Sequence, residues 1–79
     1  MLMSYKHKNY YLQLGLNIAY YRKLRGLTQA ELAEIADISR THISNIEAPG
    51  VKKSVSLDVL FHLADALDVE PGKLLEIRG

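Results

Sequence analysis

The stretch that decides the fold covers residues 28–47 and reads TQAELAEIADISRTHISNIE. Thr28 and Glu31 form a capping box, because the threonine hydroxyl accepts from the Glu31 amide while the Glu31 carboxylate reaches back to the Thr28 amide. This box predicts a helix over 29–36. Ser39 is a good N-cap for a second helix, which ends near the end of the stretch. Two helices of about two turns each are therefore joined by about three residues.

So short a connection does not suit an antiparallel hairpin with deep contact, but it does suit a helix-turn-helix. That crossing lets the second helix project from the body of the protein, and the major groove of DNA is wide enough to admit a helix. Ala33 is small where the two helices approach each other. The projecting helix is anchored from behind by Ile38, Ile43 and Ile46. Its other face is polar and free of acidic residues that would repel phosphate, and it consists of Arg40, Thr41, Ser44 and Asn45.

Helical periodicity continues on both sides of this stretch, and no run alternates between apolar and polar residues long enough to predict a strand. Before the stretch, the periodicity predicts a helix over 11–25, which Gly26 terminates. After it, Ser56 caps a helix over 57–67. A last helix over 71–77 begins at a proline, whose missing N–H would be unpaired in a first turn anyway.

These helices predict one apolar core and one all-α domain of five helices over residues 11–79, preceded by a flexible N-terminal arm over 1–10. The core stripe of each helix follows from its spacing. The residues expected to face inward are Tyr11, Leu14, Ile18, Tyr21, Leu32, Ala33, Ala36, Leu57, Leu60, Ala64 and Leu67.

The composition fits a single small folded domain, with 48% hydrophobic and 24% charged residues. The absence of cysteine excludes disulfides and thiolate metal sites. The apolar runs are far shorter than the ~20 residues of a membrane helix, and the N-terminus lacks the apolar core of a signal peptide. We therefore expect an intracellular protein, located in the cytoplasm with the nucleoid.

The charges are divided unevenly along the chain although the formal net charge is only +1. Residues 1–53 hold eight lysines and arginines against four acidic residues, whereas residues 54–79 hold two against five. A domain with one end facing a polyanion would show such a division. The charge pattern is compatible with chance as well, so it only supports the argument from the helix-turn-helix.

The combined pattern resembles the Cro and phage-repressor family of helix-turn-helix regulators, also called Xre-like. The resemblance covers residues 14–77 and implies a five-helix, lambda-repressor-like DNA-binding domain. Asp37 stands where the family often has glycine in a left-handed turn, a conformation that aspartate tolerates better than most residues. Outside the helix-turn-helix, the residues that carry the resemblance are Leu14, Gly15, Ile18, Arg22, Gly26, Leu27, Ser56, Leu57, Leu60, Leu63, Ala64, Leu67, Val69, Leu74 and Leu75.

The resemblance implies a role for each matching residue. It places Arg22 and Glu47 in an internal ion pair that ties the first helix to the end of the third, so Arg22 is not counted among the DNA contacts. The residues expected to read bases are Arg40, Thr41, Ser44 and Asn45. The residues expected to contact the DNA backbone are Thr28, Gln29, Ser39, Lys52 and Lys53. His42 is added to them because it lies inside the projecting helix, where it can make a rim contact to phosphate. An arginine can bond guanine in a bidentate way, an asparagine can do so for adenine, and a threonine methyl can meet thymine.

We expect the protein to act as a homodimer, because one small domain covers only a few base pairs. Two copies would then read a palindromic operator whose half-sites lie about one turn apart. The apolar arc of the helix over 57–67 is wider than its own core needs. The residues expected at the dimer interface are Val59, Leu63, Ala66, Leu75 and Ile77. The alternative is that Leu63 belongs to the core and that the first helix covers Val59.

Other classes of function find less support in the sequence. No serine, histidine and aspartate are arranged for catalysis and no glycine-rich loop binds phosphate, so we expect no enzyme. No cluster of cysteines or carboxylates completes a metal site around His7, His42 or His62, so we expect no metal and no cofactor. Without a ligand-binding domain in the sequence, we also expect no small-molecule ligand. The rival function is a protein-interaction or antitoxin-like module on the same fold. Restriction–modification controllers, phage repressors and antitoxins all remain open within the resemblance.

Overall fold

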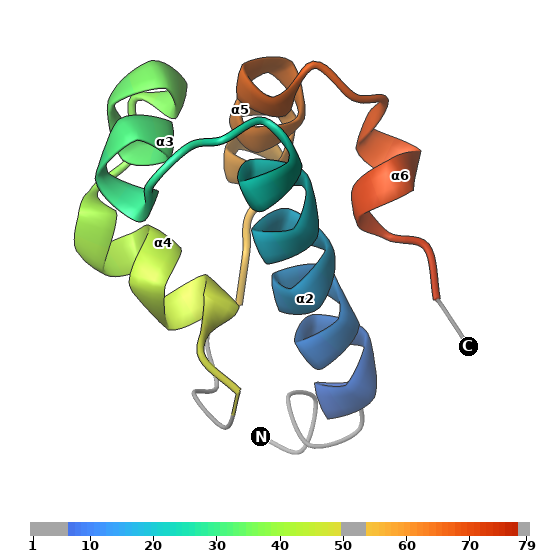
Figure 1. Cartoon of the computed structure of the whole chain (residues 1–79). Helices are drawn as coiled ribbons and strands as arrows, with labels where there is room; N and C mark the ends of the chain where they lie inside the picture. The colour runs from blue at the N-terminus through green and yellow to red at the C-terminus, as the bar shows by residue number, and fades with distance from the viewer. Residues whose placement is uncertain (1–6, 50–53, 78–79) are drawn as a thin grey trace.

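The computed structural model describes residues 7–49 and 54–77, and in these two ranges the chain forms five helices and no strand (Figure 1). The helices are α2 (Lys8–Leu24), α3 (Gln29–Ala36), α4 (Arg40–Glu47), α5 (Leu57–Leu67) and α6 (Pro71–Leu74). The predicted all-α class is thus confirmed. α4 packs against both α2 and α3, while α5 packs against α3, α2 and the short α6. No helix in the described ranges is long and apolar enough to cross a membrane.

Local capping explains where the central helices begin and end. Thr28 accepts from the Glu31 amide at 3.0 Å and its own amide donates to the Glu31 carboxylate at 2.8 Å, so the predicted capping box is present. Ser39 and Ser56 cap α4 and α5 in the same manner as predicted. Asp37 ends α3 in the left-handed conformation, with φ 58° and ψ 46°, as the resemblance implied. The sharp turn between α3 and α4 therefore rests on an aspartate rather than a glycine.

The two outer helices differ from their predicted ranges. α2 begins at Lys8, so residues 8–10 belong to the helix and not to the arm, and residues 1–6 lie outside the described ranges. α6 ends at Leu74 instead of continuing to Ile77. Beyond this end, the buried side chain of Asn17 donates to the carbonyl oxygens of Leu74 and Glu76.

A close approach of two backbones fixes how α4 lies against α2. A Cβ atom at Gly15 would collide with the backbone carbonyl oxygen of Ile46. Only glycine lets the two helices come so near, because both sides of the contact are then backbone. The C-terminal end of α4 is thereby seated directly on the middle of α2.

The core lies where the four longer helices meet, and most of its predicted members are buried there. Tyr11, Tyr21 and Ile38 are partly buried against its edge. Two predictions on α5 are wrong: Leu57 is 67% exposed, and Leu63 is fully buried rather than facing a partner. At 100° per residue Leu57 lies about 70° from the centre of the stripe that α5 turns inward, whereas Leu63 lies within it. The buried core consists of Leu14, Ile18, Leu32, Ala33, Ala36, Ile43, Ile46, Leu60, Leu63, Ala64, Leu67 and Leu74.

Candidate nucleic-acid interface

α4 presents its polar side to solvent and its apolar side to the core. Ile43 and Ile46 are buried behind it, as predicted. Arg40, Thr41 and Ser44 are exposed, and Asn45 is partly exposed. The structure therefore brings the four predicted base-reading residues to one accessible face of one helix, and their contact with bases stays a prediction.

The N-terminus of α4 is arranged to receive an anion. The Ser39 hydroxyl oxygen accepts from the His42 amide at 3.0 Å, which leaves its hydrogen free to be donated. The amides of Arg40 and Thr41, in the first turn, have no carbonyl one turn earlier in the helix. Such a helix start favours a phosphate oxygen through its N–H groups and its dipole. The half-buried His42 lies beside this start, where it was expected.

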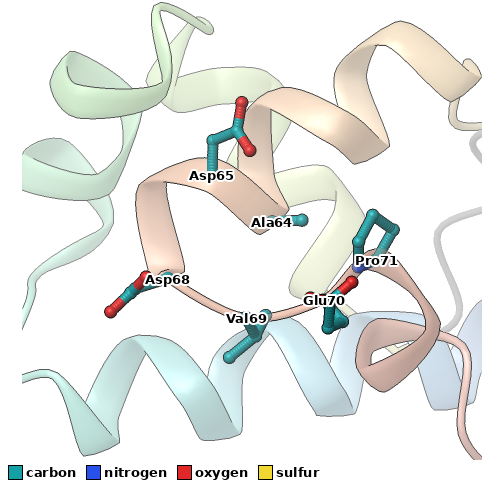
Figure 2. A pocket seen from close by; sticks show the side chains of 6 residues that line it. All are labelled: Ala64, Asp65, Asp68, Val69, Glu70 and Pro71. Atoms are coloured by element: carbon teal, nitrogen blue, oxygen red, sulfur yellow. The ribbon is translucent and has the colours of Figure 1, made fainter.

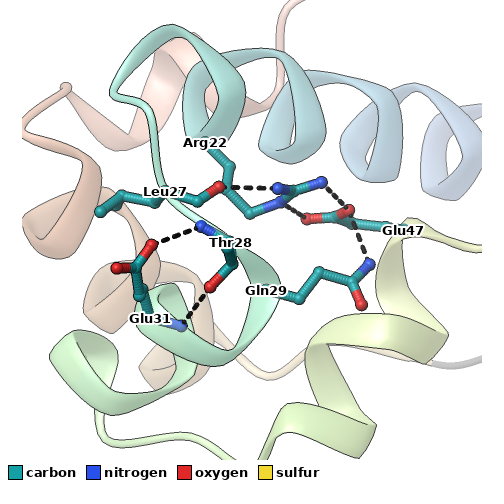
Figure 3. Close-up of polar contacts among 6 residues, drawn as sticks. All are labelled: Arg22, Leu27, Thr28, Gln29, Glu31 and Glu47. Carbon is teal, nitrogen blue, oxygen red and sulfur yellow. Dashed lines mark hydrogen bonds and ion pairs between the residues drawn. The ribbon is translucent and has the colours of Figure 1, made fainter.

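Arg22 and Glu47 form the predicted internal ion pair (Figure 3). Arg22 Nε donates to Glu47 Oε2 at 2.8 Å and Nη2 donates to Oε1 at 3.0 Å. Its third nitrogen, Nη1, donates to the carbonyl of Leu27 at 2.8 Å. The side chains are only 11% and 6% exposed. The pair joins α2, the loop before α3 and the end of α4 into one polar network.

Gln29 completes this network, which the sequence did not predict. Its Nε2 donates to Glu47 Oε1 at 3.0 Å, so the side chain links the start of α3 to the end of α4 (Figure 3). The Gln29 side chain was expected to contact the DNA backbone, and its amide group is at least partly engaged within the protein. Its backbone N–H, in the first turn of α3, keeps the geometry for a phosphate.

The network also decides the charge that α4 presents. Glu47 is the only acidic residue of this helix, and its carboxylate is turned inward onto the Arg22 guanidinium. The exposed face of α4 is left with Arg40 as its charged group, beside hydroxyl and amide groups. Lys52 and Lys53, which were expected to contact the backbone, lie outside the described ranges.

A pocket of about 400 Å³ lies elsewhere, at the corner between α5 and α6 (Figure 2). Three of its lining residues are the carboxylates Asp65, Asp68 and Glu70, with Ala64, Val69 and Pro71 completing the wall. A concentration of negative charge repels phosphate, so this corner does not suit a nucleic acid. The candidate interface is therefore the α3–α4 face and not the pocket.

The predicted dimer residues are found in three different settings. Leu63 is fully buried in the core. Val59 and Ala66 are partly buried against the core. Leu75 and Ile77 are 55% and 63% exposed, so they are available to a partner. Phe61 is also exposed on α5 and was not singled out in the sequence.

Two further polar side chains were missed because their partners are distant in sequence. Asn17 is buried on α2 and bonds the backbone after α6. Arg25 Nε donates to the carbonyl of Leu67 at 2.8 Å, and Nη2 donates to that of Asp68 at 3.1 Å. An asparagine inside an otherwise apolar stripe was the available signal for Asn17; nothing in the sequence marked Arg25.

Comparison with known proteins identifies the class. The family model for helix-turn-helix proteins (HTH_3) matches residues 18–74, and the chain belongs to this family. It is a DNA-binding helix-turn-helix transcriptional regulator of the Xre type, which confirms the expectation that it is not an enzyme.

Individual relatives resemble the chain over most of its length. It is 38% identical over 66 residues to the control protein C.SmaI of Serratia marcescens, covering 84% of this chain and 76% of that protein. The structure of the restriction-modification controller protein C.AhdI from Aeromonas hydrophila has a TM-score of 0.75 and 31% identity, over 81% of this chain and 94% of that one. A hypothetical transcription factor, NHTF from Neisseria, has a TM-score of 0.78 and 28% identity, over 85% of this chain and 75% of that one.

Proposed function

We propose that this protein is a sequence-specific regulator that binds double-stranded DNA as a homodimer, with α4 of each copy in the major groove. The observation that carries the proposal is the inward turn of Glu47. Because Arg22 holds that carboxylate, α4 presents only neutral polar and cationic groups to a polyanion. A helix that carried its one acid on the exposed face would oppose the phosphates instead.

Base contacts and phosphate contacts are proposed for different parts of the interface. Arg40, Thr41, Ser44 and Asn45 stand on a helix anchored by the core, so they read base edges. Thr28, Ser39 and His42 lie at the starts of α3 and α4, where they and the backbone amides bind phosphates. The remaining backbone contacts are the main chain at Gln29 and the side chains of Lys52 and Lys53.

The homodimer is supported by exposed apolar side chains on the α5–α6 side of the domain. Leu75 and Ile77 follow α6, and Phe61 lies on α5, against which α6 packs. We place the dimer interface on these three residues in place of Leu63, with Val59 and Ala66 at its margin. Two copies related by a twofold axis then recognise a palindromic operator.

Two of the relatives are a control protein and a restriction-modification controller protein. By that likeness we propose that this chain controls the expression of restriction–modification genes, in the cytoplasm where the chromosome is. A helix-turn-helix of this size needs no ligand domain to do so, because occupancy of the operator follows protein concentration through dimerisation.

Enrichment of random duplexes on the purified protein tests the proposal. The expected result is one inverted repeat with half-sites about one helical turn apart, bound with an affinity that falls steeply with salt. The double variant Arg40→Ala/Asn45→Ala is the control, and it should no longer enrich the repeat while still binding duplex DNA weakly. An enriched pool without a common site, or affinity unchanged by salt, would support a protein-interaction module instead.

A further inference from the structure

Two of the three residues that follow α6 are apolar and exposed to solvent. Leu75 and Ile77 are both more than half exposed, while the preceding Leu74 is fully buried. α6 itself has only four residues and ends with a single turn bond from the Leu75 amide to the Gly72 carbonyl. So short a helix has little stability of its own and does not by itself fix the path of the chain that follows.

The path is fixed from outside, by Asn17 on α2. Its Nδ2 donates to the carbonyl of Leu74 at 3.0 Å and to that of Glu76 at 2.8 Å. The two carbonyls flank Leu75, and the carbonyl of Glu76 directly precedes Ile77. Holding both of them sets the direction in which the two exposed apolar side chains point.

Both polar atoms of the Asn17 side chain are engaged in hydrogen bonds. It is 1% exposed, and its Oδ1 accepts from Gln13 Nε2 at 3.0 Å, which orients the amide with its two hydrogens toward the segment after α6. A buried amide is costly to desolvate, and an apolar side chain would fill the same volume without that cost. The specific gain from an asparagine here is the fixed backbone at residues 74–76.

We propose that Asn17 is a positioning residue for the homodimer, acting through Leu75 and Ile77, which it aligns against a second copy of the chain. This inference rests on the proposed homodimer. A surface that recognises its own copy needs apolar groups held in one geometry before contact, because ordering a loose segment on binding weakens association. Asn17 supplies that order from within the monomer.

Sedimentation equilibrium of Asn17→Ala against the wild-type protein tests the role. The expected dissociation constant of the dimer rises by about tenfold or more, with unchanged helix content by circular dichroism. Arg25→Ala is the matched control, since Arg25 also bonds two backbone carbonyls of a distant turn, those of Leu67 and Asp68. It should lower the melting temperature while changing the dissociation constant by less than about threefold.

A double-mutant cycle separates positioning from general destabilisation. In a Leu75→Ala/Ile77→Ala background, Asn17→Ala should change the dissociation constant by less than about threefold, because the side chains that it aligns are gone. If Asn17→Ala does not fold, Gln13→Leu takes its place. That variant removes only the bond that orients the amide, and it should weaken the dimer in the wild-type background alone.

The possible results separate the positioning role of Asn17 from the homodimer itself. Equal weakening by Asn17→Ala in both backgrounds, or equal weakening by Asn17→Ala and Arg25→Ala, would overturn the positioning role. So would an unchanged dissociation constant for Leu75→Ala/Ile77→Ala. A wild-type protein that stays monomeric at high micromolar concentration would overturn the homodimer itself, and with it this role. A dimer that is insensitive to Asn17 would overturn only the role.

Discussion

Arg22 on α2 donates two parallel hydrogen bonds to the Glu47 carboxylate at the end of α4. Nε donates to Oε2 at 2.8 Å, and Nη2 donates to Oε1 at 3.0 Å. The pair both seats α4 on the core and removes the helix's only acid from the exposed face. Under the proposed function, both its geometric and its electrostatic effects favour the approach of α4 to DNA. A variant that lacks one partner of the pair tests these effects.

Arg22→Met should destabilise the domain by about 3–5 kcal/mol, because Glu47 would be left buried without its counter-charge, with only the Gln29 amide as a partner. Urea denaturation measures this loss. The double variant Arg22→Met/Glu47→Leu is the control, and its stability should return to within about 1 kcal/mol of the wild type, since no charge is then stranded. A single variant as stable as the double one would show that the pair is solvated and unimportant.

Gly15→Ala should be destabilising by about 1–3 kcal/mol, although alanine is the better helix former in isolation. The added methyl would collide with the carbonyl of Ile46 and push α4 off α2. Gly72→Ala is the matched control, since a Cβ there meets nothing within 4 Å. Thermal unfolding compares them. Similar melting temperatures for the two variants would mean that α2 and α4 do not approach as closely as described.

Asp37→Gly should stabilise the domain by about 0.5–1 kcal/mol, because Asp37 holds a left-handed backbone with φ 58° that glycine adopts without strain. Asp37→Ala keeps the strain and loses the local polar compensation of aspartate, so it should be less stable than the wild type. Denaturant midpoints order the three proteins. An alanine variant as stable as the glycine variant would contradict the left-handed turn.

The local signals of this chain predicted its central helices to the residue. Thr28, Ser39 and Ser56 each cap a helix through a bond to an amide three residues later, and such a bond depends only on neighbouring sequence. The orientation of α4 was predictable for the same reason, because its isoleucines and its polar residues are separated by helical spacing.

The errors arose where a distant part of the chain decides the outcome. Leu57 and Leu63 are both leucines at plausible positions on α5, and the neighbouring helices determine which of them is covered. The chain after α6 is bonded by Asn17, whose partner Leu74 is 57 residues away. The engagement of Gln29 with Glu47 likewise required the two helices to be placed in space before it could be seen.

The assignment of the dimer interface to exposed residues separates two substitutions that the sequence alone would have grouped together. Ile77→Asp should raise the dimer dissociation constant by more than about tenfold and leave a folded monomer, because the carboxylate meets solvent until the partner arrives. Leu63→Asp should leave no folded domain, since burying a carboxylate in the core costs more than a small domain can tolerate. Circular dichroism measures whether each variant folds, and sedimentation measures the dimer dissociation constant. A folded Leu63→Asp monomer would contradict the burial of Leu63 in the core.

Arg40 and Lys52 should differ in the kind of DNA contact they make. Arg40 stands on the exposed face of α4, whose angle is fixed by Ile43 and Ile46, so it is held rigidly enough to read a base. Arg40→Ala should cost about 1–3 kcal/mol on the preferred site and relax the choice at one base pair in each half-site. A scrambled duplex should be bound almost as before.

Lys52 belongs to the stretch after α4 whose charges were assigned to the DNA backbone, and a contact to phosphate carries no sequence information. Lys52→Ala should therefore weaken binding to the preferred and scrambled duplexes alike, and it should reduce the log–log salt slope by about 1 per subunit. Binding of both variants to both duplexes over a salt series distinguishes the two patterns. If Arg40→Ala weakens both duplexes equally and lowers the slope, Arg40 is a phosphate contact, and base reading must rest on Thr41, Ser44 and Asn45.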